Sequence, residues 1–204
     1  MRLAYEEKVH ANDTFRDRYF AVPKEVNKKI PLTMREVQRM MSLDLSDVPY
    51  MELSRNIFVL GCFLGLRVSD LKQISPLHIH DESEGKYINI KTVKTGVEVR
   101  IPLNSIVRDI LEAYGDQLPK FNEQVVNRHL KILAVRIGLN KIRASKLSIH
   151  YSRATFAKLT YEMGIPSLFI MKVTGHTTEK NFLRYVNISP EEAVTEFRKH
   201  DFFK

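Results

Sequence analysis

Apolar residues recur along most of the chain at intervals of three and four positions, which is the spacing of one face of an α-helix. The clearest example joins Val126, Leu130, Leu133 and Ile137, with Asn122 placed to cap the start of the helix. Similar signals predict further helices after Thr33 and over residues 49–63, 69–74, 105–114, 148–163, 167–173, 178–186 and 191–202. The pattern therefore predicts a mainly helical protein.

One stretch changes to the alternation of apolar and polar residues that is typical of β-strands. Residues 87–92 alternate, and so do residues 97–101, which Pro102 closes. The link between the two runs contains Gly96, so we predict an antiparallel hairpin with Lys94 near its tip. The expected fold class is α+β, mainly α with a small antiparallel β-sheet.

Length and composition fit one globular domain. The chain has 204 residues, and 44% of them are apolar, which is enough for a hydrophobic core. No apolar run reaches the roughly 18 residues of a membrane span, and Cys62 is the single cysteine, so neither a disulfide within the chain nor a cysteine cluster for zinc is expected. We expect a cytoplasmic protein with no membrane partner and no metal site.

The first 30 residues are charged and weakly patterned, in contrast to the chain that follows. We expect residues 1–30 to be an extended lead-in or the remnant of an interdomain linker. Residues 31–204 are expected to form the folded domain.

Positive charge is concentrated in one part of the sequence. The formal net charge is +8, and residues 124–161 contain basic residues but no acidic one. Such a block is expected where a protein contacts the phosphate backbone of nucleic acid, whereas an ordinary solvated helix face normally mixes acids with bases. The candidate DNA-binding residues in this block are Arg128, Lys131, Lys141, Arg143 and Lys146.

Two segments place arginine where an anion could bind. Arg67 lies between apolar residues just after a predicted helix end, so its charge must meet an anion or pair with a neighbour such as Asp70. His150 and Arg153 lie three positions apart near a predicted helix start, which suits an oxyanion. A histidine and an arginine at this spacing are also common as surface residues, so both interpretations remain open.

Three further residues have chemical potential and an ordinary explanation. His176 lies in a turn between predicted helices, and Tyr185 lies at the edge of the apolar side of the next helix, where a tyrosine is usually half-buried packing. Lys94, near the predicted hairpin tip, would ordinarily be a solvated lysine. Taken singly, none of the three identifies a function.

Taken in order, these residues resemble the active-site set of the tyrosine recombinase, or phage integrase, family. Residues 63–71 and 147–157 look like its two arginine boxes, residues 174–178 followed by Tyr185 look like its closing section, and the segment around Lys94 is similar to its lysine hairpin. The resemblance spans residues 32–189 and implies a tyrosine recombinase catalytic-domain fold for residues 31–204. The matching candidate catalytic residues are Arg67, Lys94, His150, Arg153, His176 and Tyr185.

The resemblance implies a role for each residue in cleaving and rejoining DNA strands. Arg67 and Arg153 would clamp the non-bridging phosphate oxygens. Tyr185 would be the nucleophile that forms a 3′-phosphotyrosyl intermediate, and His150 would act as its acid or base. His176 would donate a hydrogen bond to a phosphate oxygen, and Lys94 would protonate the leaving 5′ oxygen. No metal or cofactor is implied.

The family also implies partners. Strand exchange would bring together double-stranded DNA and a homo-oligomer, a tetramer on DNA, in a site-specific recombinase or integrase of a mobile element. Residues 190–204 are a possible partner-docking tail, although packing on the chain's own core explains their apolar stripe equally well. Family members normally carry an N-terminal DNA-binding domain, so this chain is either an excised catalytic domain or naturally short.

Two other enzymatic or binding classes share part of the pattern. A type IB topoisomerase has the arginines, lysine and tyrosine, but usually carries lysine where His150 stands. A catalytically inactive DNA-binding relative would keep the fold without the reaction. The presence of all six expected side chains favours the active recombinase.

Overall fold

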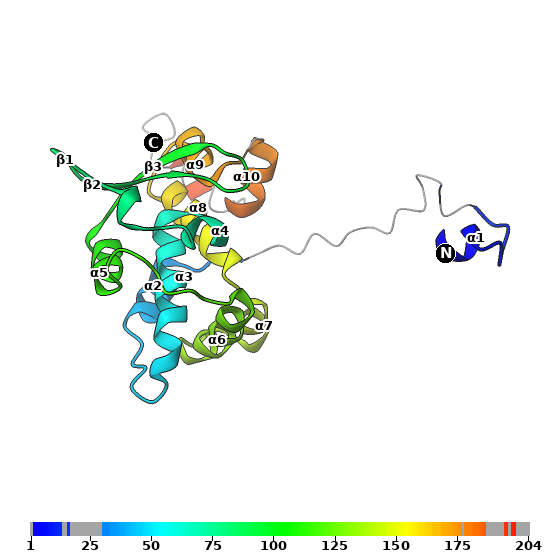
Figure 1. The fold of residues 1–204 in the computed structure, drawn as a ribbon, viewed down its shortest axis with the longest axis horizontal. Helices are drawn as coiled ribbons and strands as arrows, with labels where there is room; N and C mark the ends of the chain where they lie inside the picture. The colour runs from blue at the N-terminus through cyan, green and yellow to red at the C-terminus, as the bar shows by residue number, and fades with distance from the viewer. Residues whose placement is uncertain are drawn as a thin grey trace.

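The structure is a computed structural model. It describes residues 2–13, 16, 30–176, 178–186, 194–195 and 197–198, and it leaves undescribed the side chains at positions 2, 181, 184 and 185. Figure 1 shows a mainly helical body with a small sheet at one edge, and α1 (Arg2–Glu6) lies well apart from it. The short helix α1 differs from the extended conformation expected for the first residues.

The helices of the body follow the sequence prediction closely. They are α2 (Met34–Met41), α3 (Glu52–Leu64), α4 (Val68–Leu71), α5 (Ser105–Ala113), α6 (Glu123–Arg136), α7 (Lys141–Lys146), α8 (His150–Glu162), α9 (Ser167–Thr174) and α10 (Glu179–Val186), with short 3₁₀ helices η3 (Pro49–Met51) and η4 (Pro76–His78). The predicted Asn122 cap is confirmed at the start of α6. Thr33 and Glu36 form a capping box at the start of α2, and Gly65 ends α3 in the left-handed conformation.

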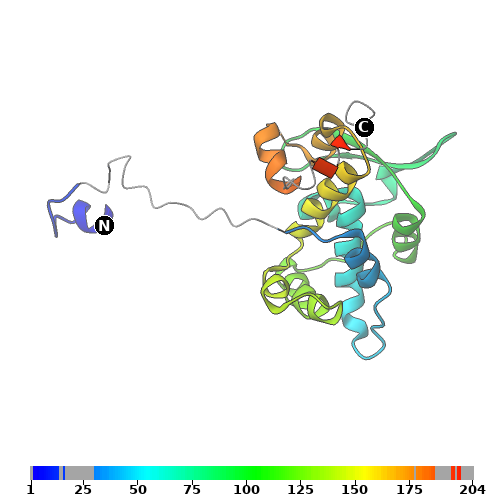
Figure 2. The ribbon, with the colours of Figure 1, turned by 180° about the vertical axis from the view of Figure 1, so that it is seen from behind.

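The core is built around α3. Its Ile57, Phe58, Leu60 and Leu64 are fully buried, and Figures 1 and 2 show α3 running through the middle of the body, with the other helices arranged around it. The α3 helix packs mainly against α8, with α2, α5 and α6 as further neighbours. From Ile57 to Leu64 the helix is apolar on all sides, as expected for a segment at the centre of a domain.

A close approach between small residues joins α3 to α8. A Cβ atom added to Gly61 on α3 would collide with the side chain of Ser152 on α8. The Ser152 hydroxyl donates to the Ile149 carbonyl at the start of its own helix, so it needs no hydrogen-bond acceptor from α3. This packing holds the end of α3, which leads to Arg67, beside the turn of α8 that carries Arg153.

The sheet has three antiparallel strands in the order β1 (Ile79–Glu82), β2 (Gly85–Lys91) and β3 (Glu98–Pro102). The predicted hairpin is confirmed, with Tyr87 opposite Pro102 and Lys91 opposite Glu98. Strand β1 was not predicted, because its four residues carry only one apolar side chain, and pairing with β2 rather than alternation makes it a strand.

Helix bounds differ where tertiary contacts decide them. The α7 helix was not predicted, since it is short and basic, and α4 begins and ends earlier than the predicted segment 69–74. Of the predicted last helix, most residues lie outside the described part of the chain, although Val194 and Phe197 are described and half-exposed. None of the helices in the described part has the length and apolar character of a bilayer-spanning segment.

A substitution at Gly65 tests how closely α3 and α8 pack where α3 ends. Gly65 has a φ of 64°, and a Cβ atom there would lie within 3 Å of atoms of the Phe156 ring. We expect Gly65→Ala to lower the free energy of unfolding by about 3 kcal/mol, because left-handed backbone strain and overpacking add. Gly164→Ala, at a φ of 82° with nothing within 4 Å, should cost only about 1–2 kcal/mol. Equal losses in urea unfolding would contradict the packing argument.

Candidate active site

Asp70 fixes the backbone that carries Arg67. Its buried carboxylate accepts hydrogen bonds from the backbone N–H of Arg67 at 3.3 Å and from the backbone N–H of Val93 at 2.8 Å. Within the described part of the chain, Asp70 makes no ion pair with the Arg67 guanidinium. One carboxylate therefore ties the start of α4 to the β2–β3 turn, and the alternative in which Asp70 neutralises Arg67 is not what the structure shows.

The Arg67 guanidinium lies against the turn that follows α9. A Cβ atom on Gly175 would be 3.4 Å and 3.5 Å from its two terminal nitrogens. Gly175 ends α9 with a φ of 57°, so it serves both the turn and the close approach of the arginine. Residues far apart in the sequence, Arg67 and the segment leading to His176, thus meet in space.

Arg153 reaches the same place from α8. Its side chain is buried, with 7% of the residue exposed, and its Nη1 donates to the Gly65 carbonyl at 2.7 Å. Gly65 is the residue that caps α3, two positions before Arg67. A buried guanidinium requires hydrogen-bond partners, and a carbonyl without a partner in its own helix is a favourable one.

His176 completes the cluster. The Thr174 hydroxyl donates to the Ile170 carbonyl at 2.7 Å, so it must accept at 2.7 Å from Nδ1–H of His176. Burial, then the charge of Arg153, then that of Arg67 lower the pKa of His176 from 6.5 to about 4. The imidazole is therefore neutral near pH 7, and the two guanidinium groups lie close enough to act on it.

The pKa of His176 provides a direct test of this convergence. We expect Arg153→Gln to raise it from about 4 toward 6.5, because the substitution removes a nearby positive charge. An NMR pH titration of the histidine ring measures the value. A pKa that stays near 4 in the variant would show that Arg153 is too distant to act on His176.

The same pKa has a consequence for stability. Because the unfolded chain binds the His176 proton near pH 6.5 and the folded chain only near pH 4, the contribution of this residue to stability is present at neutral pH and decreases as the pH falls between these values. An anion held between the arginines would weaken their field and favour the protonated imidazole.

The candidate residues His150 and Lys94 are both exposed. His150 is the first residue of α8, its side chain is 58% exposed, and its Nε2 is 3.5 Å from Oε1 of Glu123 on α6. Lys94 is exposed in the β2–β3 turn, directly after Val93, the residue that Asp70 anchors. Both side chains can therefore be reached from solvent.

Tyr185 is on α10, but its side chain lies outside the described part of the structure. The helix is held by Phe182 and Val186, which are fully buried in a small cluster with Phe156 and Ile170. The Phe182 ring makes an edge contact with the His176 ring, with centroids 5.9 Å apart. The backbone that carries Tyr185 therefore packs beside α8 and α9.

The candidate DNA-binding residues fall into two groups. Four of them, Arg128, Lys131, Lys141 and Lys146, are exposed on α6 and α7.

The fifth candidate, Arg143, instead makes a bidentate ion pair with Glu36 on α2, at 2.7 Å and 3.0 Å. Arg136, another basic residue of the same stretch, makes a bidentate ion pair with Asp47. Burial opposes ionisation of Glu36, but hydrogen bonds from Arg143 and Thr33 outweigh it and hold the pKa of this carboxyl below its ordinary value. Spacing in the sequence does not reveal these long-range pairs.

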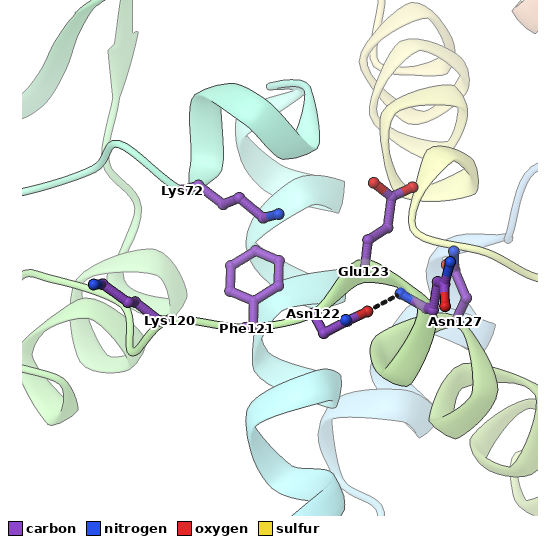
Figure 3. Close-up of a pocket in the computed structure, with 7 residues that line it drawn as sticks. Lys72, Lys120, Phe121, Asn122, Glu123 and Asn127 are labelled. Atoms are coloured by element: carbon purple, nitrogen blue, oxygen red, sulfur yellow. Dashed lines mark hydrogen bonds between the residues drawn. The ribbon is translucent and has the colours of Figure 1, made fainter.

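A cavity of about 650 Å³ opens near the start of α6 (Figure 3). Lys72 reaches over the Phe121 ring, with its Nζ 5.2 Å from the ring centroid, and Glu123 extends toward the start of α8. The lining residues are Lys72, Lys120, Phe121, Asn122, Glu123, Gln124 and Asn127. Sequence reasoning did not single out this cavity, because its lining comes from two separate segments and has no shared motif.

The chemistry of the cluster is that of an anion site. Two guanidinium groups and an imidazole converge on one turn, and such groups stabilise the oxygens of a phosphate or a similar anion. Among the described residues, no group of three His, Cys, Asp or Glu side chains is placed to hold a metal ion.

Solved structures share this fold. The chain superposes on the XerA recombinase with a TM-score of 0.64 at 17% identity, covering 84% of this chain and 65% of that one. It is similar to a λ integrase dimer bound to a COC' core site (TM-score 0.63, 21% identity, 91% and 68% covered) and to the Tn1549 transposon integrase (TM-score 0.66, 16% identity, 98% and 75% covered). These similarities confirm the tyrosine recombinase catalytic-domain fold.

The chain spans about half to two-thirds of the length of the XerA and XerH recombinases. A comparison with curated proteins found no significant match in sequence. The family model described as "Phage integrase family" matches residues 31–192, which is most of the chain. The protein therefore belongs to the phage integrase family.

Proposed function

We propose that this chain is the catalytic domain of a site-specific DNA recombinase, which cleaves and rejoins DNA strands in the cytoplasm. The observation that carries the proposal is the convergence of Arg67, Arg153 and His176 on one turn. A phosphodiester is an anion, and its transition state gains negative charge, so preorganised guanidinium donors lower the barrier. The catalytic domain corresponds to residues 31–204.

In the proposed reaction the Tyr185 oxygen attacks the phosphorus atom and the 5′ oxygen leaves. The bond between tyrosine and the 3′ phosphate forms as the bond to the 5′ oxygen breaks, so the ester is conserved and no nucleotide is consumed. His150 accepts the phenol proton, and Lys94 supplies a proton to the leaving oxygen. The exposure of both side chains supports these roles, because each must meet the DNA backbone.

His176 has a different part in this scheme. It is neutral without DNA, with its Nδ1–H held by Thr174. A phosphate between Arg67 and Arg153 would offset the positive field and favour a proton on Nε2, which could then donate to a phosphate oxygen. Binding of the phosphate would therefore be coupled to the protonation of this residue.

Double-stranded DNA is the proposed partner, and the working assembly is a tetramer on DNA. Similar proteins support a DNA partner and an oligomer: XerH was solved bound to a palindromic difH substrate in a post-cleavage complex, and λ integrase as a dimer on its core site. Residues 190–204 are the proposed segment for docking on a neighbouring subunit.

The exposed basic residues are expected to set the salt dependence of binding. Arg128→Gln and Lys131→Gln should each lower DNA affinity and reduce the slope of log affinity against log salt by about 0.9, the value for one lost phosphate contact. Arg136→Gln is the matched control, because its guanidinium is already paired with Asp47. If the slope changes only in Arg136→Gln, then Arg128 and Lys131 do not contact DNA phosphates and this prediction is wrong.

The test of the proposed function is covalent capture of DNA. A nicked duplex, carrying a site that the protein has selected from random-sequence DNA, is incubated with it and then resolved by denaturing electrophoresis. The nick lets the short cleaved strand diffuse away, so the protein–DNA adduct accumulates. An adduct supports the recombinase; bound DNA without any adduct would favour the inactive DNA-binding relative.

A further inference from the structure

Two residues of α6 hold the start of α8. Asn127 accepts a hydrogen bond through Oδ1 from the backbone N–H of Ile149 at 2.8 Å. Glu123, one turn earlier on the same helix, places Oε1 at 3.5 Å from Nε2 of His150. Residues four apart lie on the same face of a helix, so this face contacts both the backbone and the first side chain of α8.

The contact from Asn127 provides an acceptor for a buried backbone N–H that has no partner within its own helix. The first N–H groups of a helix have no partner inside it, and Ile149, at the N-cap position of α8, makes no side-chain capping bond. The Asn127 side chain supplies an acceptor from another helix. It therefore sets the position and direction of the turn that carries His150 and, three residues later, Arg153.

The contact from Glu123 acts on the imidazole itself. His150 is 58% exposed, so its own packing does little to hold one rotamer. A carboxylate beside Nε2 favours the tautomer with the proton on that nitrogen, which leaves the lone pair on Nδ1 to accept a proton. Bases in nucleophilic catalysis are commonly oriented by a third group in this way. Such contacts are often long before substrate binds.

The place of Glu123 in the sequence and the cavity adds a second argument. It is the last acidic residue before the acid-free stretch 124–161, and it lines the cavity beside Lys72 and Lys120. A carboxylate at a surface that receives DNA repels phosphate, so it weakens binding. A role in orienting His150 would explain why a carboxylate that weakens DNA binding lies at this position.

We propose that Glu123 and Asn127 are positioning residues for His150 in the strand-cleavage step, Asn127 by fixing the first turn of α8 and Glu123 by orienting the imidazole through Nε2. This inference rests on the proposed function, in which His150 is the acid or base. Neither residue touches the reacting phosphate; both act through His150.

The test is a double-mutant cycle in single-turnover cleavage of the nicked duplex used above. Glu123→Gln should lower the cleavage rate about 10-fold or more, as for other residues that orient a functional histidine, without weakening DNA binding. In a His150→Ala background the same substitution should have no further effect, because the group it orients is gone. Glu123→Asp should recover part of the rate.

Glu52→Gln is the matched control for the charge at the first position of a helix. Glu52 begins α3 as Glu123 begins α6, and it pairs with Arg55 rather than with a histidine, so its loss should leave the cleavage rate unchanged. For Asn127, Asn127→Asp keeps the acceptor for Ile149 and should cleave faster than Asn127→Ala.

The outcomes separate this inference from the function on which it rests. If His150→Ala slows cleavage but Glu123→Gln has no effect, or has the same effect in both backgrounds, the positioning role is overturned and the recombinase stands. If the wild-type protein forms no adduct, or cleavage does not depend on His150, the proposed function fails at that step, and this inference fails with it.

Discussion

Tyr185→Phe is expected to abolish the covalent protein–DNA adduct while leaving DNA affinity within about twofold. The substitution removes one oxygen atom, which is the atom that would attack phosphorus. A free phenol has a pKa of about 10, so attack at neutral pH depends on a base and on a positive field, and in the proposed site Arg67 and Arg153 supply that field. The measurement is denaturing electrophoresis with a labelled strand.

Tyr161→Phe is the matched control for that loss. Tyr161 lies near the end of α8 and packs against Phe182, with ring centroids 6.4 Å apart, so it is a tyrosine of the same neighbourhood with no proposed role. It should form the adduct at the wild-type rate. If Tyr185→Phe retains the adduct, another group is the nucleophile.

Arg67→Ala should slow strand cleavage by roughly 10²–10³-fold, the usual cost of removing one preorganised donor to a developing negative charge. In the described part of the chain, Asp70 accepts a hydrogen bond from the backbone N–H of Arg67 and makes none with its side chain, so the fold of this segment should survive the substitution. Arg67→Lys keeps the charge but loses the planar fork that contacts two oxygens, so it should restore only a small part of the rate.

Single-turnover cleavage with protein in excess separates this effect from binding. We expect the rate constant for cleavage to fall in both variants, with DNA affinity changed much less, because the exposed basic residues on α6 and α7 are proposed to make most contacts with the DNA phosphates. A loss confined to affinity, with normal cleavage of bound DNA, would show that Arg67 only attracts DNA.

Local chemistry explains which elements could be predicted from the sequence. Thr33, Asn122 and Gly65 mark helix ends through capping groups or a left-handed residue, and these signals depend only on neighbouring positions. Strand β1 and helix α7 carry no comparable signal. The strand exists because β2 pairs with it, and α7 is tied to α2 by the Arg143–Glu36 ion pair across 107 positions.

The candidate site shows the same division. The order of the arginines, histidines and tyrosine along the chain predicted the candidate catalytic residues, and the structure brings Arg67, Arg153 and His176 together. The sequence could not show that Asp70 bonds two backbone N–H groups rather than a guanidinium, or that Asn127 reaches Ile149. Such contacts join elements whose separation is decided by packing, so no spacing rule contains them.

Peptide mapping of the adduct is the most direct measurement of the central claim. Trypsin cleaves after Arg184 and Arg198, and the peptide 185–198 contains one tyrosine, at its first position. After nuclease digestion of the DNA, mass spectrometry should find a 3′-phosphonucleotide attached to that tyrosine. An unmodified peptide together with the nucleotide on another residue, or an adduct found nowhere in the chain, would contradict this account.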